Sequence, residues 1–319
     1  MNNEQFVHRS SLIATMTRRL AVAALTALAL SAVGCSSAQA AQHGVLILLV
    51  SGRLRGRATG CDCPGGFSGG LPRRAAAIEE LFVGSPPIGL DCGGFLDLDP
   101  EMGRFMSRCT LFGLARLGLK VAGVTPRDLF YGPGFISSLA DSAGITLLSA
   151  NLIDAPTGEP LFQRWAVFRA EAQTIAVTSL ADYEPGRRYT TSIGWTVVPP
   201  DTVLPEVAAT RPDTADVVIL LTDIGESELR RLLVEFPLFD LVLTSSRHFY
   251  TTSPCKIETT LVVQPKPDGR ALEWVILSPG APVADHFRYA DLPLAGNRRE
   301  NLPTLDWLNR CLGRLPVGK

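Results

Sequence analysis

The chain has 319 residues, of which 46% are hydrophobic and 19% are charged, and its formal net charge is -1. This composition is that of a globular protein with ample core-forming residues, and the length allows one large domain or two small ones. The near-neutral charge argues against nucleic acid as the main partner, because phosphate backbones are bound by clustered Lys and Arg.

The N-terminal segment is typical of an export signal. A basic pair precedes the apolar run 20–34, which is too short for a comfortable membrane span, and small residues follow. The sequence AVGC at 32–35 resembles a lipoprotein box, in which Cys35 would be lipidated and tether the protein to a membrane surface. AQA at 38–40 would also suit ordinary signal peptidase, so both routes stay open, with the lipoprotein favoured. We predict that residues 1–40 are a leader and that the mature protein is periplasmic or on the outer cell surface.

Strand and helix patterns alternate along the rest of the chain. Continuous apolar runs of strand length are typical of strands buried on both faces. Such a run lies at 44–50, and further strand patterns lie at 88–91, 120–125, 145–152, 174–180, 216–222 and 240–246. Helical spacing of apolar residues predicts helices at 72–82, 102–118, 128–143 and 226–236. The segment 259–277 predicts two strands around a turn at 267–269.

The alternation favours an α/β layered fold with a mainly parallel or mixed sheet. In such sheets, ligand sites gather in the loops after the carboxyl ends of the strands. The sequence has no repeat, no low-complexity linker and no obvious domain boundary, which indicates a single mature domain. We place that domain at 43–280 and expect residues 281–319 to pack on it as a C-terminal tail.

The loops after the predicted strands carry a series of short motifs. They are GGL-x-RR at 69–74, LD-x-G at 90–93, RDL at 127–129, SANL at 149–152 and DLVL at 240–243 with a histidine nearby. Their order resembles the calcineurin-like metallophosphoesterase superfamily, and within it the catalytic domain of periplasmic 5′-nucleotidases. A branch of exported relatives with a Cys-x-Cys element before GGL-x-RR is more similar still. The resemblance covers roughly 44–274 and implies a four-layered α/β/β/α sandwich with two metal ions at these loops.

Most positions of the implied metal ligands carry other residues. The Asp-x-His of the first loop reads Ser51-Gly52-Arg53 here, and the Gly-Asp whose carboxylate bridges both metals reads Gly93-Gly94. The Asn-His motif of the family falls near 125–128 in this chain, and its next metal-binding histidine falls near Asp223. The final Gly-His-x-His motif falls at 246–248. His248 is thus the one retained histidine, with Asp91 and Asp128 as nearby carboxylates.

These departures weaken a two-metal site. Two neighbouring cations need several oxygen and imidazole donors, and a bridging carboxylate offsets their repulsion. Gly94 cannot supply that carboxylate, and Arg53 adds positive charge. We therefore predict a degenerate site without a resident cofactor, in a protein that binds or scaffolds at the envelope rather than catalyses. The chain also ends at Lys319, which we expect to leave no room for the nucleoside-binding second domain of the nucleotidases.

Two alternatives stay open. The first is a metal-dependent phosphohydrolase with a site rebuilt from Asp91, Asp128, Asp223 and His248. The second is a thiol or metal protein, because the implied fold brings several cysteine loops to one end of the sheet. Three thiols with an imidazole or a fourth thiol make a recognisable divalent-metal set. Its candidate members are Cys61, Cys63, Cys92, His248 and Cys255.

Disulfides are the favoured state of these cysteines, because an even number in an oxidising compartment usually forms bridges. If the implied fold is right, Cys61 or Cys63 would bond to Cys92 or Cys255 and close the glycine-rich loop at 60–70. A bridge between Cys61 and Cys63 themselves is disfavoured by their adjacent geometry. Elsewhere, Cys109 is expected in the core and Cys311 is expected to pin the tail by a disulfide. The expected partners are a membrane surface, through the lipid, and an envelope protein.

Overall fold

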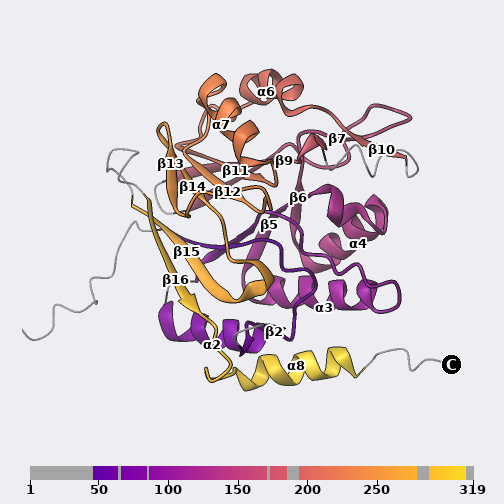
Figure 1. Ribbon diagram of the computed structural model, residues 1–319, viewed down its shortest axis with the longest axis vertical. Helices are drawn as coiled ribbons and strands as arrows, with labels where there is room; N and C mark the ends of the chain where they lie inside the picture. The colour runs from indigo at the N-terminus through magenta and orange to yellow at the C-terminus, as the bar shows by residue number, and fades with distance from the viewer. Residues whose placement is uncertain are drawn as a thin grey trace, which may run out of the picture. The chain divides into compact units, whose positions relative to one another are not determined.

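Two six-stranded sheets stack face to face, with helices on their outer faces (Figure 1). The computed structural model describes residues 46–63, 66–84, 86–170, 173–184, 194–278 and 287–313. All of these residues belong to one unit, Gly44–Lys319. The predicted leader and Cys35 lie outside the described residues. The expected four-layered α/β/β/α sandwich is confirmed.

The first sheet has the strand order β16-β15-β1-β4-β5-β6. Its strands are β1 (Leu46–Ser51), β4 (Ile88–Asp91), β5 (Leu119–Gly123), β6 (Thr146–Leu148), β15 (Ala271–Leu277) and β16 (Phe287–Pro293). β1, β4, β5 and β6 run parallel, and β15 and β16 join antiparallel at one side. The parallel strands therefore end at the same edge of the sheet.

The second sheet has the order β13-β14-β12-β11-β9-β8. Its strands are β8 (Trp165–Ala170), β9 (Gln173–Leu180), β11 (Val217–Thr222), β12 (Leu241–Thr244), β13 (Cys255–Ile257) and β14 (Thr260–Val263). The four central strands β9, β11, β12 and β14 are parallel. Two small sheets pair β2 (Cys61–Cys63) with β3 (Gly66–Ser68), and β7 (Leu152–Asp154) with β10 (Trp195–Val197).

Helices cover both outer faces. The first sheet is covered by α2 (Leu71–Leu81), α3 (Gly103–Arg116) and α4 (Pro133–Ala143), with α8 (Leu302–Leu312) packed against α2 and α3. The second sheet is covered by α6 (Pro200–Ala209) and α7 (Glu226–Glu235), on the opposite side in Figure 1. Two 3-10 turns, η1 (Pro126–Leu129) and η2 (Pro267–Gly269), lie in the connecting loops.

Apolar side chains on both faces of each sheet explain the continuous apolar runs of the sequence. In β1, Leu48 and Val50 pack between the sheets, whereas Leu49 packs under α2. Because a strand buried on both faces has no polar side, its sequence does not alternate. The inter-sheet core then holds the strand ends of both sheets in a fixed relation.

Three predicted elements differ in the structure. The helix predicted at 128–143 begins at Pro133, because Gly132 has φ 86° and the preceding residues form η1. The strand predicted at 145–152 is split into β6 and β7. The two strands at 259–277 are no hairpin, since β14 joins the second sheet beside β12 and β15 joins the first beside β1.

The segment after residue 281 supplies the edge strand β16 and the helix α8. A disulfide between Cys109 of α3 and Cys311 of α8 fastens this segment to the first layer, which confirms the expected bridge at Cys311. Cys109 is fully buried, as expected for a core residue. Within the described ranges, no helix has both the length and the apolar character needed to cross a membrane.

Candidate functional site

The strand ends of the two sheets meet and form one site. Ser245 Oγ, after β12, donates a hydrogen bond of 2.9 Å to the carbonyl oxygen of Cys92, after β4. Arg53 Nη1, after β1, donates one of 3.4 Å to the carbonyl oxygen of Ser246. We call this edge the strand-end site. It consists of Ser51–Arg53, Asp91–Gly94, Thr125–Asp128, Asp182, Asp223 and Ser245–His248.

Asp91 is fully buried at the end of β4. The parallel strands β1 and β4 pair in a register that places Ser51 opposite Asp91. Ser51 Oγ donates a hydrogen bond of 2.6 Å to Asp91 Oδ2. The amide of Gly93 donates one of 2.8 Å to Asp91 Oδ1. Burial raises the pKa of Asp91 to about 6, against the opposing effect of these two donors. Both carboxylate oxygens are thus used within the protein.

Asp128 is also fully buried and is surrounded by donors. Its Oδ2 accepts hydrogen bonds from the amides of Gly94 (2.8 Å) and Thr125 (3.1 Å) and from Thr125 Oγ1 (2.7 Å). Its Oδ1 accepts from the amides of Phe95 (3.0 Å) and Leu96 (3.3 Å). Burial raises the pKa of Asp128 despite these donors. The carboxylate joins the loop after β4 to the loop after β5, which is a structural task.

Asp223 and Asp182 form a pair of carboxyl groups on the second sheet. The amide of Asp182 donates a hydrogen bond of 2.7 Å to Asp223 Oδ1. Burial raises the pKa of Asp223 to about 7, and the neighbouring charges of Asp182 and Asp128 add to the rise. Burial likewise raises the pKa of Asp182, which stays partly exposed. Asp223 can therefore hold a proton near neutral pH.

His248 lies at the exposed rim of the strand-end site. Its Nδ1 is 3.1 Å from the hydroxyl of Tyr250, and its backbone carbonyl accepts a hydrogen bond from the amide of Glu226 at the start of α7. Its charge opposes the rise in the pKa of Asp182. The structure thus places His248 beside the pair Asp182 and Asp223, and places Asp91 and Asp128 deeper in the first sheet.

Arg53 packs against Gly94, the position at which the resemblance implies the bridging carboxylate. A Cβ atom added to Gly94, which has φ 76°, would lie 3.3 Å from the Cα of Arg53. Gly93 is more restricted, since its Cβ would lie 2.4 Å from Thr125 Cγ2. A side chain at either position would strain the loop. The loop after β4 therefore fits glycine, and the side chain of Arg53 lies against it.

The cysteines do not form the predicted cluster. Cys92 and Cys255 are free thiols, so the predicted bridge from Cys61 or Cys63 to either of them is wrong. Cys92 packs in the inter-sheet core and Cys255 packs toward α6 and α7, because they lie on opposite sides of the second sheet. Cys61 is in a disulfide with another partner, which removes it as a thiolate ligand. The side chain of Cys63 lies outside the described residues.

In the part of the chain that the structure describes, no three side chains of His, Cys, Asp or Glu are close enough together to hold a metal ion. The buried thiol of Cys92 is also a poor ligand, because burial raises its pKa well above the usual range. It donates a hydrogen bond of 3.2 Å to the carbonyl oxygen of Ser51. The donor set is a poor fit for the divalent ions that the resemblance implies.

Sequence reasoning missed Asp182. It follows β9 in the segment TSLAD at 178–182, so a carboxylate two residues after an apolar strand was the available signal. Arg247 was likewise seen only as a spacer within the motif at 246–248. Both lie at the carboxyl ends of parallel strands, where ligand sites of layered α/β folds gather.

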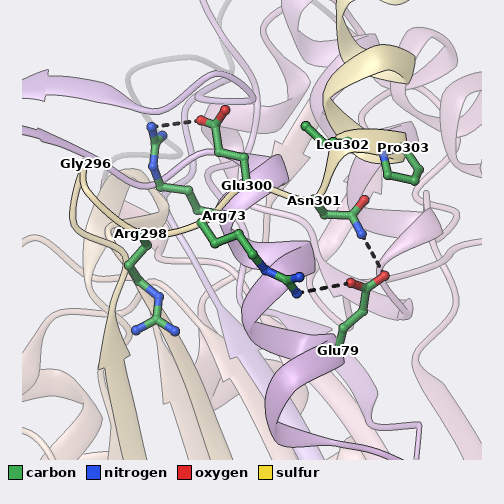
Figure 2. Close-up of a pocket in the computed structure, with 9 residues that line it drawn as sticks. Arg73, Glu79, Gly296, Arg298, Glu300, Asn301, Leu302 and Pro303 are labelled. Atoms are coloured by element: carbon green, nitrogen blue, oxygen red, sulfur yellow. Dashed lines mark hydrogen bonds and ion pairs between the residues drawn. The ribbon is translucent and has the colours of Figure 1, made fainter.

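A separate pocket lies away from the strand-end site, between α2 and the loop that precedes α8 (Figure 2). Its charges are paired: Arg73 contacts Glu300 at 2.8 Å, and Asn301 donates a hydrogen bond of 2.7 Å to Glu79. Arg298 pairs with Glu80 at 2.9 Å. Arg299, the third cation of this pocket, lies 3.8 Å from Glu79. These contacts fasten the C-terminal segment to α2 and leave none of the three arginines without a carboxylate partner.

Comparison with solved structures identifies the fold. The sulfate thiohydrolase SoxB of Thermus thermophilus superposes with a TM-score of 0.71 at 18% identity, over 84% of this chain and 60% of that one. A 5′-nucleotidase precursor from Thermus thermophilus gives 0.66 at 15% identity, over 84% and 58%. The calcineurin-like phosphoesterase YfkN from Bacillus subtilis gives 0.64 at 14% identity, over 85% and 98%.

The fold is that of the calcineurin-like phosphoesterases. The resemblance found in the motifs is thereby confirmed at the level of the phosphoesterase fold. Neither the protein-family models nor the sequences of curated proteins give a match. The chain spans about three fifths of the length of SoxB and of the 5′-nucleotidase precursor.

Proposed function

We propose that this protein is an exported, lipid-anchored binding or scaffolding protein with a phosphoesterase fold whose strand-end site does not hydrolyse its ligand. The observation that carries the proposal is Arg53, which holds the place of a metal-ligating histidine and packs against Gly94, the place of the bridging aspartate. A guanidinium at this position opposes the binding of two cations by charge repulsion.

The nearby carboxylates Asp91 and Asp128 support the same proposal. Asp91 and Asp128 accept hydrogen bonds on both oxygens from groups of the protein itself. A metal ligand needs free lone pairs directed at the ion, so these carboxylates would have to exchange structural hydrogen bonds for metal bonds. Asp223 resists ionisation, because burial raises its pKa to about 7, and a protonated carboxyl group is a poor ligand.

Export is supported by the leader pattern and by the disulfide. The bridge between Cys109 and Cys311 is of a kind that persists in oxidising compartments outside the cytosol. Lipidation at Cys35 would hold the protein at a membrane surface, where an envelope protein is the kind of partner we propose. The formal charge of -1 gives no basis for a nucleic-acid partner.

The experiment is a hydrolysis assay of the purified chain with Mn²⁺, Mg²⁺, Zn²⁺ or no metal. The substrates are AMP, p-nitrophenyl phosphate and bis-p-nitrophenyl phosphate, and an active phosphoesterase serves as the positive control. We expect no turnover above the rate without protein. Metal-dependent turnover that is lost in Asp223→Asn and His248→Ala, but kept in the surface variant Asp213→Asn, would establish the rebuilt phosphohydrolase instead.

A further inference from the structure

Two arginines of the strand-end site lack a carboxylate partner. Arg53 is half-buried, its Nε is buried without a hydrogen bond, and its guanidinium makes one long contact to the carbonyl oxygen of Ser246. Arg247 follows Ser246 directly and is exposed. Throughout the described ranges, no ion pair is formed by either guanidinium. Both side chains thus keep donors available where the loops after β1 and β12 meet.

The neighbouring arginines differ, because they are already paired. Arg55 and Arg270 lie 3.8 Å and 3.4 Å from the carboxylate of Asp268, which is nearly buried. Burial lowers the pKa of Arg53, and the charges of Arg55 and Arg247 add to this effect, whereas Cys92 and Asp268 oppose it. The carboxylate of Asp268 pairs with Arg55 and Arg270, whereas neither Arg53 nor Arg247 forms an ion pair among the described residues.

The loop that carries Arg53 is held in an unusual conformation. Arg53 and Arg55 both have φ 51°, in the left-handed region that residues other than glycine rarely adopt. Backbone hydrogen bonds fix the loop, from the Arg53 amide to the Gly93 carbonyl (2.8 Å) and from the Arg55 amide to the Gly94 carbonyl (3.1 Å). Such conformations persist where surrounding structure imposes them, and they gather at functional sites.

The nearby carboxyl groups do not neutralise the two arginines. Asp91 and Asp128 use both oxygens in hydrogen bonds to Ser51 and to backbone amides on the first sheet. Asp223 accepts a hydrogen bond from the amide of Asp182 on the second sheet, and no ion pair joins it to either arginine among the described residues. The positive charge of Arg53 and Arg247 is therefore available to a ligand.

We propose that Arg53 and Arg247 together bind a small tetrahedral oxyanion, inorganic phosphate or sulfate, without a metal ion. The inference rests on the proposed function, since it gives the non-hydrolytic site its ligand. Guanidinium groups present planar pairs of N–H donors that match the oxygens of such anions. A dianion between the two arginines would remove their mutual repulsion and supply acceptors for the unpartnered donors of Arg53.

The test is isothermal titration calorimetry of the full chain after chelator treatment and desalting. Inorganic phosphate, inorganic sulfate and the monoanion nitrate are titrated separately at constant ionic strength, because salt screens such contacts. We expect saturable binding of phosphate or sulfate and no binding of nitrate. The anion that binds more tightly is then the ligand that we assign. Arg247→Gln should weaken binding about tenfold or more, and Arg53→Gln should weaken it further.

The matched control is Arg57→Gln, which removes one exposed guanidinium from the same segment and should leave the affinity unchanged. Arg247 is exposed and unpaired, so Arg247→Gln keeps the fold and the test stands even where Arg53→Gln unfolds. Absence of saturable binding in the phosphate and sulfate arms, or equal loss in Arg57→Gln, overturns the inference and leaves the proposed function standing. Metal-dependent hydrolysis of p-nitrophenyl phosphate overturns the proposed function instead.

Discussion

At the scale of single residues, the buried carboxylate of Asp128 stabilises the fold. Asp128 receives five hydrogen bonds, and three of its donors are amides of consecutive residues, Gly94, Phe95 and Leu96. The loop after β4 is thereby wrapped around one side chain of another loop. Asp128 thus has a structural role that needs no metal ion.

Replacement of Asp128 should therefore destabilise the protein strongly. Asp128→Ala leaves several buried amides without an acceptor, and each costs about 1–3 kcal/mol, so we expect a loss on the order of 3 kcal/mol or more in the free energy of unfolding. Urea denaturation measures it, with Asp141→Ala on the exposed face of α4 as the control. Equal, small losses in both variants would show that Asp128 is not a structural anchor.

The pKa of Asp91 gives a prediction with a definite sign. Asp91 has a pKa of about 6 in the folded protein, raised by burial from its ordinary value of 3.8. Between these values the unfolded chain releases the proton and the folded chain keeps it, so the stabilising contribution present at low pH is lost as pH rises through about 6. Asp91→Asn mimics the protonated form and escapes this loss.

We expect Asp91→Asn to gain stability relative to the native chain as pH rises from 4 to 7, by on the order of 2 kcal/mol. Urea midpoints at both pH values measure the gain. Asp213→Asn, which removes an exposed carboxylate, should show no such trend. A gain for Asp91→Asn that falls with rising pH would mean that the folded state favours the carboxylate of Asp91, contrary to its burial.

At the scale of elements, the sequence predicted the strands whose own residues carry a clear pattern. β4 is found with the predicted ends, because a strand buried on both faces reads as an apolar run. β8 and β16 were missed, since these edge strands are only partly buried and carry a weak pattern. The partners of β14 and β15 were misjudged because each pairs with a strand distant in sequence, which no turn signal between them reveals.

The disulfide between α3 and α8 should contribute measurably to stability. It joins residues 202 positions apart, and bridges that close long loops typically contribute about 2–4 kcal/mol. Cys311→Ser should lower the melting temperature by several degrees, and reductant should lower that of the native chain similarly. Reductant should have a much smaller effect on Cys311→Ser. A native chain indifferent to reductant would show that packing of α8 alone holds the segment.

At the scale of the whole molecule, the fold could be predicted from the sequence but the site only in part. The order of motifs indicated the phosphoesterase fold, and the substitutions at Ser51, Arg53 and Gly94 indicated a changed site. The free state of Cys92 and Cys255 could not be predicted, because it depends on tertiary packing, which places Cys92 between the sheets and Cys255 on the outer side of the second sheet. The availability of Arg53 and Arg247 likewise depends on which arginines share the carboxylate of Asp268.

The proposed anchor is tested with Cys35, which lies outside the described residues. In cells that produce the full chain, Cys35→Ser should move the protein from the membrane fraction to the soluble fraction, because a lipid is the attachment that we propose. Immunoblots of both fractions measure the shift, and Ser36→Ala is the matched control. Release of the native chain into the soluble fraction would contradict the lipid anchor and favour ordinary signal peptidase.

Elemental analysis of the exported, purified protein decides whether the strand-end site works without metal ions. We expect zinc, manganese and iron far below one atom per chain, since Arg53 and Gly94 replace two of the implied ligands and Asp91 and Asp128 are engaged within the fold. Near-stoichiometric zinc, manganese or iron that survives dialysis would overturn the metal-free site and restore the phosphohydrolase as the leading function.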